Sequence, residues 1–268
     1  MKGRVLIIAG SDSGGGAGIQ ADIKTVTALD GYAATAVSAL TAQNTKGVFG
    51  VIPVPPEFIA QQMRLVLEDI GADAVKTGML HSAAVINTVA SVLQELAPNV
   101  PLVIDPVIAA KDGTRLLDID AVAALKRNLM AGSAVLIPNI PEAEALSGMT
   151  IRDVDDMQHA AQILLTLGPD AVLLKGGHLS ADTLVDVLAT ADGIEMFQGT
   201  RIKTKHTHGT GCTLASAVAT GLAQGMTVRD AVIRARDYVR RAIESAPGFG
   251  GGHGPLNHAH TVQSEAGY

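Results

Sequence analysis

The sequence predicts an α/β protein with a central, mostly parallel sheet. Short apolar runs alternate with longer segments of helical periodicity through most of the 268 residues. Some apolar runs are uninterrupted, such as Val103-Ile104 and Val172-Leu173-Leu174, as expected for strands buried on both faces. Hydrophobic residues make up 47% of the chain and charged residues 17%, which is enough for a large core and excludes intrinsic disorder.

The strands of the sheet are predicted from the apolar runs. Continuous Val, Ile, Leu and Ala side chains fit a strand that lies between two layers of helices. In chain order the predicted strands are Val5–Ala9, Ala33–Leu40, Ala74–Thr77, Pro101–Asp105, Ala134–Ile137 and Ala171–Lys175, with weaker candidates near Thr183–Leu188 and Ile194–Phe197.

The helices are predicted between and after these runs, where apolar residues recur with helical spacing. In chain order they are Ala17–Leu29, Pro56–Ile70, Ser82–Leu96, Ile119–Asn128, Pro141–Leu146, Asp153–Leu167, Gly211–Gln224 and Val228–Ser245. Alternation of strand and helix is typical of βα units that build a parallel sheet, in which ligands bind beyond the carboxyl ends of the strands.

Composition excludes several classes of function. The net charge is −6 and is spread along the chain, which argues against a basic nucleic-acid-binding surface. Three Tyr, four Phe and no Trp are too few for a platform that stacks single-stranded bases. No stretch approaches the roughly 18 apolar residues of a membrane span. We therefore expect no nucleic acid and no membrane as partners.

The organisation of the chain suggests one domain in the cytoplasm. A single cysteine cannot form an internal disulfide, so nothing indicates an oxidising compartment. The apolar run Val5–Ala9 is shorter than the apolar region of a signal peptide. We find no linker, charge block or repeat, and we expect one domain over residues 1–268, with a surface loop at Gly248–Gly254 and a loose tail after about residue 258.

The first predicted strand leads into a glycine-rich loop, Gly10–Gly18, that matches neither common nucleotide-binding pattern. A phosphate-binding loop would need Lys where Gly16 stands, and the dinucleotide fingerprint would need Gly where Ile19 stands. A loop whose backbone approaches a small ligand and a simple turn both remain open.

A second glycine-rich segment, Gly209-Thr210-Gly211-Cys212, opens a long Ala-rich helix. Free backbone N–H groups and the helix dipole make such a terminus an anion site suited to a phosphoryl group. Cys212 falls in the first turn, where the same field favours its thiolate. The alternative is a small buried cysteine packed under a capped helix.

Other predicted strand ends carry polar groups that suit phosphoryl transfer. Asp105, Asn139 and Glu142 offer oxygen ligands to Mg²⁺, directly or through water, and Lys175 can neutralise phosphate charge. Asn139-Ile140-Pro141-Glu142 also fits a plain helix cap with Pro at its first position.

Five histidines lie near or after the second glycine-rich segment. His206, His208, His253, His258 and His260 match no structural zinc spacing and have no cysteine partners. We expect loop histidines, with His208 assisting phosphate binding.

Five motifs together resemble the hydroxymethylpyrimidine/phosphomethylpyrimidine kinases of thiamine biosynthesis. The motifs are Ala-Gly-Ile-Gln-Ala-Asp at 17–22, Thr-Ala-Gln-Asn-Thr at 41–45, Pro-Asn-Ile-Pro-Glu at 138–142, Lys-Gly-Gly-His at 175–178 and Gly-Thr-Gly-Cys at 209–212. The resemblance covers nearly the whole chain, including Gly-His-Gly-Pro-Leu-Asn-His at 252–258.

The resemblance implies a ribokinase-like fold, a three-layer sandwich with helices on both faces of a mostly parallel sheet. It implies ATP and Mg²⁺ as cofactors, a homodimer, and two successive phosphorylations of the small-molecule substrate 4-amino-5-hydroxymethyl-2-methylpyrimidine, to the monophosphate and then the diphosphate. It further implies a pyrimidine pocket lined by Ala17, Asp22, Thr41, Gln43, Met79 and Val107.

The catalytic roles that the resemblance implies complete this expectation. Most ribokinase-like enzymes have an Asp where Cys212 stands, so a Cys212 thiolate would be the base. Gly209, Thr210 and Gly211 would form the anion hole. Lys175 would neutralise the ATP phosphates, beside the His208 expected there from its position, and the metal set would be Asp105, Asn139 and Glu142.

Three other functions compete with this interpretation. A pyridoxal kinase branch shares the scaffold and the Gly-Thr-Gly-Cys loop, but it carries a second cysteine where this chain has Ile108-Ala109-Ala110-Lys111. A cysteine hydrolase using Cys212 and His208 would leave Lys175, Asp105 and Glu142 without a role. A catalytically silent pyrimidine or nucleotide sensor would not need the complete polar set.

Overall fold

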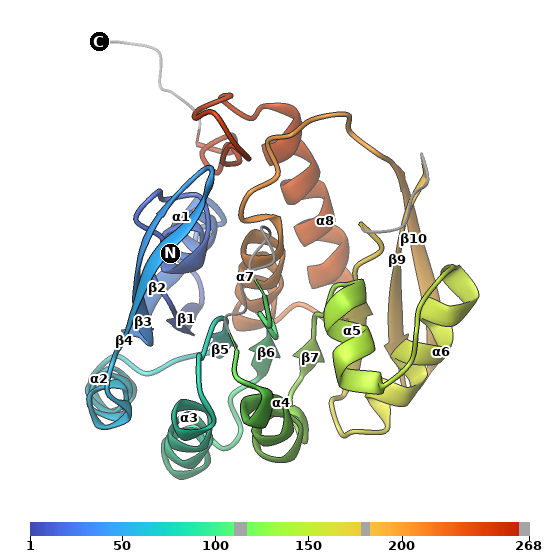
Figure 1. Ribbon diagram of the computed structural model, residues 1–268. Coiled ribbons are helices and arrows are strands. Elements are labelled where there is room, and N and C mark those ends of the chain that lie inside the picture. The colour runs from blue at the N-terminus through green and yellow to red at the C-terminus, as the bar shows by residue number, and fades with distance from the viewer. Residues whose placement is uncertain (110–116, 178–182, 263–268) are drawn as a thin grey trace.

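The computed structural model describes residues 1–109, 117–177 and 183–262 (Figure 1). In this part of the chain, an eight-stranded sheet has the order β10-β9-β8-β7-β6-β5-β1-β2. The strands are β1 (Arg4–Ala9), β2 (Tyr32–Val37), β5 (Ala74–Thr77), β6 (Leu102–Ile104), β7 (Val135–Leu136), β8 (Ala171–Leu174), β9 (Thr183–Thr190) and β10 (Gly193–Thr200). All neighbouring strands from β2 to β8 in this order are parallel, whereas β9 is antiparallel to both of its neighbours, β8 and β10.

Helices cover both faces of this sheet, which confirms the predicted α/β class (Figure 1). They are α1 (Gly18–Ala28), α2 (Pro56–Asp69), α3 (Ala83–Leu96), α4 (Ile119–Leu125), continued by a π-helical turn at Lys126–Met130, α5 (Ile140–Ser147), α6 (Val154–Leu165), α7 (Thr210–Ala223) and α8 (Val228–Glu244). Alternate side chains of one strand enter two cores: Val5 and Ile7 pack toward α7 and α8, and Leu6 and Ile8 toward α2 to α6. This explains why β1 is apolar without interruption.

A two-stranded antiparallel sheet, β3 (Ala39–Asn44) and β4 (Gly47–Pro53), departs from the sequence prediction. The predicted strand Ala33–Leu40 is divided at the buried Ser38, whose N–H donates to the Ala9 carbonyl, and β4 was not predicted. This sheet lies outside the main sheet: β3 alternates between exposed and less exposed residues, and β4 is exposed over most of its length although its sequence is apolar.

The segment after α8 is better fixed than the sequence suggests. Leu256 and His258 are buried, His260 Nε2 lies 3.0 Å from the Tyr238 carbonyl oxygen, and Thr261 donates to the Ala28 carbonyl. The expectation of a loose tail after about residue 258 is therefore wrong as far as residue 262, and the rest lies outside the described residues.

The division into one domain stays a prediction. None of the helices in the described ranges combines the length and apolar character that a membrane crossing requires.

A close approach between chain segments fixes the carboxyl end of β8. The Gly176 N–H donates to Asp186 Oδ1, and Arg236 Nε of α8 donates to Asp186 Oδ2 at 2.8 Å. A Cβ at position 176 would overlap the Val185 carbonyl oxygen. Only glycine fits this position without moving β9.

We predict that Gly176→Ala lowers the free energy of unfolding by about 1–3 kcal/mol, because the added methyl group forces the two strands apart. The neighbouring Gly177→Ala is the matched control, since a Cβ there would meet only Leu184 Cδ1, at an ordinary 3.9 Å. Chemical denaturation of both variants measures the difference. Equal stability of the two variants would contradict the packing argument.

Candidate active site

The amino terminus of α7 lies at the carboxyl edge of the parallel strands. Gly209 precedes the helix with a left-handed backbone, φ 83°, and no side chain in the described residues caps the helix. The first N–H groups of a helix have no partner within it, and the helix dipole concentrates positive potential there. Gly209, Thr210 and Gly211 therefore form a backbone site suited to an anion.

Lys175 and Asp105 lie directly beside this terminus. A Cβ placed on Gly211 would be 3.3 Å from Lys175 Nζ and 3.7 Å from Asp105 Oδ2. Lys175 follows β8 and Asp105 follows β6, so the residues directly after these two parallel strands lie close together. Lys175 Nζ is 3.3 Å from Asp105 Oδ1. Burial acts to lower the pKa of Lys175, but Asp105 and Glu142 outweigh it and the pKa is raised, so Lys175 is a cation at neutral pH.

Asn139 and Glu142 have a structural task in addition to any role in binding. The Asn139 side chain accepts from the Glu142 N–H, and Glu142 Oε2 accepts from the Asn139 N–H, which makes a capping box at the start of α5. Burial raises the pKa of Glu142, against the opposing charge of Lys175. Across the described ranges, no group of three or more His, Cys, Asp or Glu side chains could together hold a metal ion.

Cys212 lies in the first turn of α7, but the expected thiolate is wrong for this structure. Burial raises the pKa of the Cys212 thiol to about 12; Lys76 opposes the shift, and the carboxylates of Asp22 and Asp105 add to it. The helix terminus does not compensate for the lost hydration and the two nearby negative charges. Cys212 is a neutral thiol at pH 7.

The residues expected at the pyrimidine pocket divide into two groups. Ala17, Thr41 and Gln43 gather around the first glycine-rich loop: the Ala17 N–H donates to Asp12 and the Thr41 hydroxyl to the Ser11 carbonyl at 2.8 Å. Asp22 is fully buried and bonded to Lys76 and Ser216, so it lies beneath this surface and not on it.

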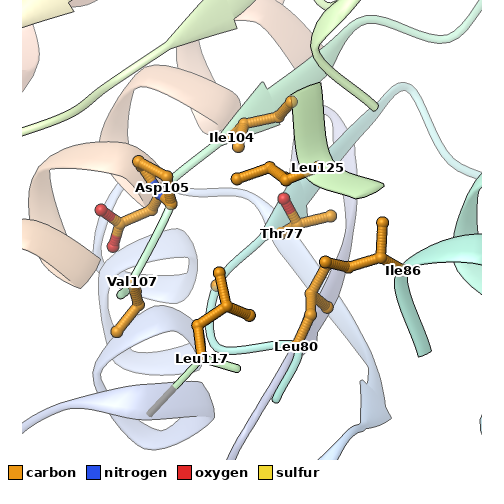
Figure 2. A pocket seen from close by; sticks show the side chains of 10 residues that line it. Thr77, Leu80, Ile86, Ile104, Asp105, Val107, Leu117 and Leu125 are labelled. Atoms are coloured by element: carbon orange, nitrogen blue, oxygen red, sulfur yellow. The ribbon is translucent and has the colours of Figure 1, made fainter. Parts of the chain in front are cut away.

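Met79 and Val107 flank this region from two other strand ends. The Met79 methyl group lies against Gly10, where a Cβ would meet it. Val107 lines a small pocket with Asp105, Thr77 and Leu117 (Figure 2). Thr77 Oγ1 is buried there and has no hydrogen-bond partner in the described structure. The wall next to Asp105 is therefore apolar apart from one hydroxyl group.

His208 lies with the first glycine-rich loop and not with Lys175. Its Nε2 atom is 2.9 Å from Asp12 Oδ2 and 3.2 Å from Gln43 Nε2. The expected contact with donor phosphates is therefore not supported by its position. His208 instead connects the segment before α7 to the β3 strand and the Asp12 loop.

Asp12 is the site residue that the sequence analysis missed. It is buried, and its carboxylate accepts from the N–H groups of Gly14, Gly16 and Ala17. Burial acts to raise the pKa of Asp12, but the hydrogen bonds from His208 and the backbone outweigh it and the pKa is lowered. An Asp that begins a run of glycines, whose N–H groups it can fold around itself, is the signal that could have found it.

The carboxyl-terminal segment supports the start of α7. The Thr213 hydroxyl donates to the Gly209 carbonyl oxygen at 2.8 Å, and His258 Nε2 lies 2.9 Å from the same hydroxyl oxygen. Because the Thr213 proton is already engaged, His258 must be the donor. Burial lowers the pKa of His258 to about 4, so its ring is neutral near pH 7.

Comparison with known proteins identifies relatives that match most of the chain. A family model described as phosphomethylpyrimidine kinase matches residues 12–257. The hydroxymethylpyrimidine/phosphomethylpyrimidine kinase of Bacillus subtilis is 48% identical over 258 residues, which cover 95% of this chain and 94% of that protein. The thiamine biosynthesis bifunctional protein of Geobacter sulfurreducens is 52% identical over 257 residues; the match covers 96% of this chain but only 52% of that protein, so the chain spans about half its length.

Solved structures agree with these sequence relatives. Phosphomethylpyrimidine kinase from Clostridium difficile has a TM-score of 0.80 and 41% identity, covering 90% of this chain and 100% of that one. Pyridoxal kinase from Staphylococcus aureus in complex with AMP-PCP has a TM-score of 0.90 and 32% identity, covering 99% and 96%. Residues 110–111 and His178 of the sequence motifs lie outside the described residues of this chain.

We predict an acid-sensitive stability from His258. Its pKa is about 4 when folded and about 6.5 when unfolded, so below pH 6.5 the unfolded chain binds a proton that the folded chain does not. The contribution of the neutral His258 ring to the free energy of unfolding is therefore complete above about pH 6.5 and is lost as the pH falls toward 4. His258→Gln, measured by denaturation from pH 7.5 to 4.5, should flatten the decline, whereas His159→Gln on the exposed side of α6 should not. Parallel curves for His258→Gln and the unmodified protein would refute the prediction.

Proposed function

Because the chain belongs to the phosphomethylpyrimidine kinase family and is a kinase, we propose that it phosphorylates 4-amino-5-hydroxymethyl-2-methylpyrimidine twice, with ATP as the donor. The observation that carries the proposal is the position of Lys175 and Asp105 beside the α7 terminus. A cation and aligned N–H groups at one point suit a phosphoryl group whose negative charge spreads over its oxygens during transfer. The AMP-PCP complex of the Staphylococcus aureus pyridoxal kinase supports a nucleoside triphosphate as donor.

The acceptor is proposed to bind between the first glycine-rich loop, β3 and the Asp105 strand end. Gln43 carries both a donor and an acceptor for the edge of an aminopyrimidine, while Met79 and Val107 supply apolar contact to the ring. Ala17 and Thr41 also line the proposed pocket. Asp22 is removed from it because its carboxylate is already bonded to Lys76 and Ser216.

Mg²⁺ fits the donor side of the site through Asp105 and Glu142. Two carboxylates beside one lysine give an excess of negative charge and oxygen ligands, which is the chemistry that Mg²⁺ prefers. Asn139 is a weaker candidate because its side-chain oxygen already caps α5. When bound, the cation would neutralise charge on the ATP phosphates. Gly209, Thr210, Gly211 and Lys175 would orient the transferred group.

Cys212 is proposed as the base for the first transfer. The thiolate takes the proton of the acceptor hydroxyl, the freed oxygen bonds to the γ-phosphorus, and the bond from that phosphorus to ADP breaks. A pKa of about 12 makes the thiolate scarce at pH 7. The same value brings its proton affinity closer to that of an alcohol, so each thiolate is a more effective base.

Pyridoxal kinase activity is the second candidate, because pyridoxal kinases from Bacillus subtilis and Staphylococcus aureus have TM-scores of 0.87 and 0.90 with this chain. Incubation with MgATP and separately with the hydroxymethylpyrimidine, its monophosphate and pyridoxal, followed by mass spectrometry, tests both. We expect both pyrimidine phosphates. Pyridoxal phosphate as the dominant product would favour the second candidate, and no turnover would refute both.

We predict that Cys212→Ala slows the first transfer far more than the second, by at least about tenfold, because the second acceptor is a phosphate already anionic at pH 7. The first transfer should also accelerate with pH from 7 to 9, while the second changes little. Initial rates on the two acceptors measure both effects, with Gly177→Ala as a control that leaves the site in place. Equal losses on the two acceptors would rule out the base.

We also propose a cytoplasmic homodimer, formed through the outer face of the β3–β4 sheet. Leu40 and Ile52 are cross-strand partners, 51% and 67% exposed, and Phe49 near the turn is 71% exposed. Exposed apolar side chains of this size on one small sheet are typical of a protein interface. By strand alternation, Leu40 and Ile52 lie opposite the face that carries Thr41 and Gln43.

We predict that Ile52→Lys converts the dimer to a monomer, because a buried unpaired ammonium would face the partner. Sedimentation equilibrium at micromolar concentration measures the mass. Met196→Lys on the exposed β10 strand is the matched control and should stay dimeric. A dimeric Ile52→Lys variant, or a monomeric unmodified protein, would contradict this interface.

A further inference from the structure

A fully buried ion pair lies beneath the first two turns of α7. Lys76 on β5 and Asp22 on α1 have no exposed side-chain surface, and Lys76 Nζ is 3.0 and 2.9 Å from the two Asp22 oxygens. The Ser216 hydroxyl of α7 donates to Asp22 Oδ1 at 2.7 Å. A buried pair of this kind is costly to desolvate and is weak evidence for stability alone. Its position suggests another role.

The helical spacing of these residues aligns the pair with Cys212. Cys212 and Ser216 are four residues apart on α7, and Gly18 and Asp22 are four residues apart on α1, so each pair shares one helix face. The Gly18 N–H approaches the Cys212 thiol, and the Ser216 hydroxyl approaches Asp22 one turn further along. Lys76 reaches this junction from the sheet below. The space it enters is tight, since a Cβ at Gly78 would lie 3.0 Å from Lys76 Nζ.

Four charged groups that interact electrostatically with Cys212 come from four different elements. Lys76 lies on β5, Asp22 on α1, Asp105 after β6 and Lys175 after β8. Burial acts to lower the pKa of Lys76, but Asp22, Cys212 and Asp105 outweigh it, so Lys76 stays a cation. Lys175 is engaged by Asp105 and Glu142 at the proposed phosphate site. Lys76 is therefore the cation available to stabilise a negative charge on the Cys212 sulfur.

We propose that Lys76 is a positioning residue of this kinase, whose buried ammonium, fixed by Asp22 and Ser216, stabilises the charged form of Cys212. The proposal rests on the proposed role of Cys212 as base. The thiol proton leaves to solvent, Lys76 balances the resulting thiolate, and the thiolate then takes the proton of the acceptor hydroxyl. Asp22 opposes this effect, so the pair sets how much thiolate is present.

The two members of the pair must therefore have opposite effects on Cys212. Removing the Lys76 charge leaves Asp22 facing the thiol and disfavours the thiolate, whereas removing the Asp22 charge leaves Lys76 unopposed and favours it. A pair with a purely structural role would behave differently. Loss of either member would then loosen the same packing and change Cys212 in the same direction.

Alkylation of the single cysteine by iodoacetamide between pH 7 and 10 measures this directly, because Cys212 is the only thiol in the sequence. At pH well below the thiol pKa, a shift of one pKa unit changes the thiolate fraction about tenfold. We expect Asp22→Asn to raise the alkylation rate at pH 8 about tenfold and Lys76→Met to lower it by a similar factor. The double variant should return toward the unmodified rate.

Asp22→Asn keeps the shape of the side chain, so it tests the proposal even if Lys76→Met fails to fold, which circular dichroism would reveal. Lys203→Met removes the same charge from an exposed position and is the control for long-range effects. Rates that coincide with the unmodified protein, or single variants that shift in the same direction, would overturn the proposal.

Activity measurements separate this inference from the proposed function. Lys76→Met should slow the first transfer more than the second, as Cys212→Ala does. If alkylation shifts as expected while Cys212→Ala retains both transfers, the base assignment fails and the control of the thiol by Lys76 stands. If alkylation does not shift while Cys212→Ala is selective, the inference about Lys76 fails and the base assignment stands.

Discussion

The site depends on one close backbone approach, in which Gly209 lies against the carbonyl oxygen of Gly16. A Cβ at position 209 would overlap that oxygen, and Gly209 also has the left-handed backbone that glycine adopts at little cost. This contact brings the loop that carries Asp12 next to the first turn of α7. The proposed acceptor pocket and the proposed anion site thus become neighbours. The Thr213 hydroxyl donates to the Gly209 carbonyl, and His258 in turn donates to the Thr213 hydroxyl.

Charge is distributed around this contact in two layers. The outer layer contains Lys175, whose side chain is slightly exposed, and the buried carboxylates of Asp105 and Glu142, at the proposed phosphate site. The inner layer is the buried pair of Lys76 and Asp22. Each lysine has a carboxylate partner, so neither leaves an unpaired charge in the interior. In the proposed reaction the outer lysine would face the transferred group and the inner lysine the thiol, so one cation would serve each side.

Much of the fold could be predicted from the sequence, because buried parallel strands and amphipathic helices each leave a clear pattern. The predicted helix Pro56–Ile70 differs from α2 by one residue at its carboxyl end, and Gly211–Gln224 differs from α7 by one residue at each end. The family resemblance stated from five motifs is confirmed by the family match over residues 12–257. The β3–β4 sheet was missed because its strands lie outside the core, where β4 is mostly exposed in spite of its apolar sequence.

The parts of the site that could not be predicted all depend on burial and long-range contact. A helix terminus favours a thiolate in general, but the opposing carboxylates of Asp22 and Asp105 come from distant parts of the chain. His208 is close to the anion segment in sequence, yet its side chain turns to Asp12, 196 residues away. The helix cap formed by Asn139 and Glu142 could be predicted because it depends only on residues close in sequence.

A structure of the protein with a non-hydrolysable ATP analogue and the hydroxymethylpyrimidine would test the central claim most directly. The account predicts the γ-phosphate at the N–H groups of Gly209 to Gly211, with Lys175 Nζ in contact and the acceptor hydroxyl beside Cys212. A γ-phosphate on the Gly10–Gly18 loop, or an acceptor whose hydroxyl lies away from Cys212, would contradict it.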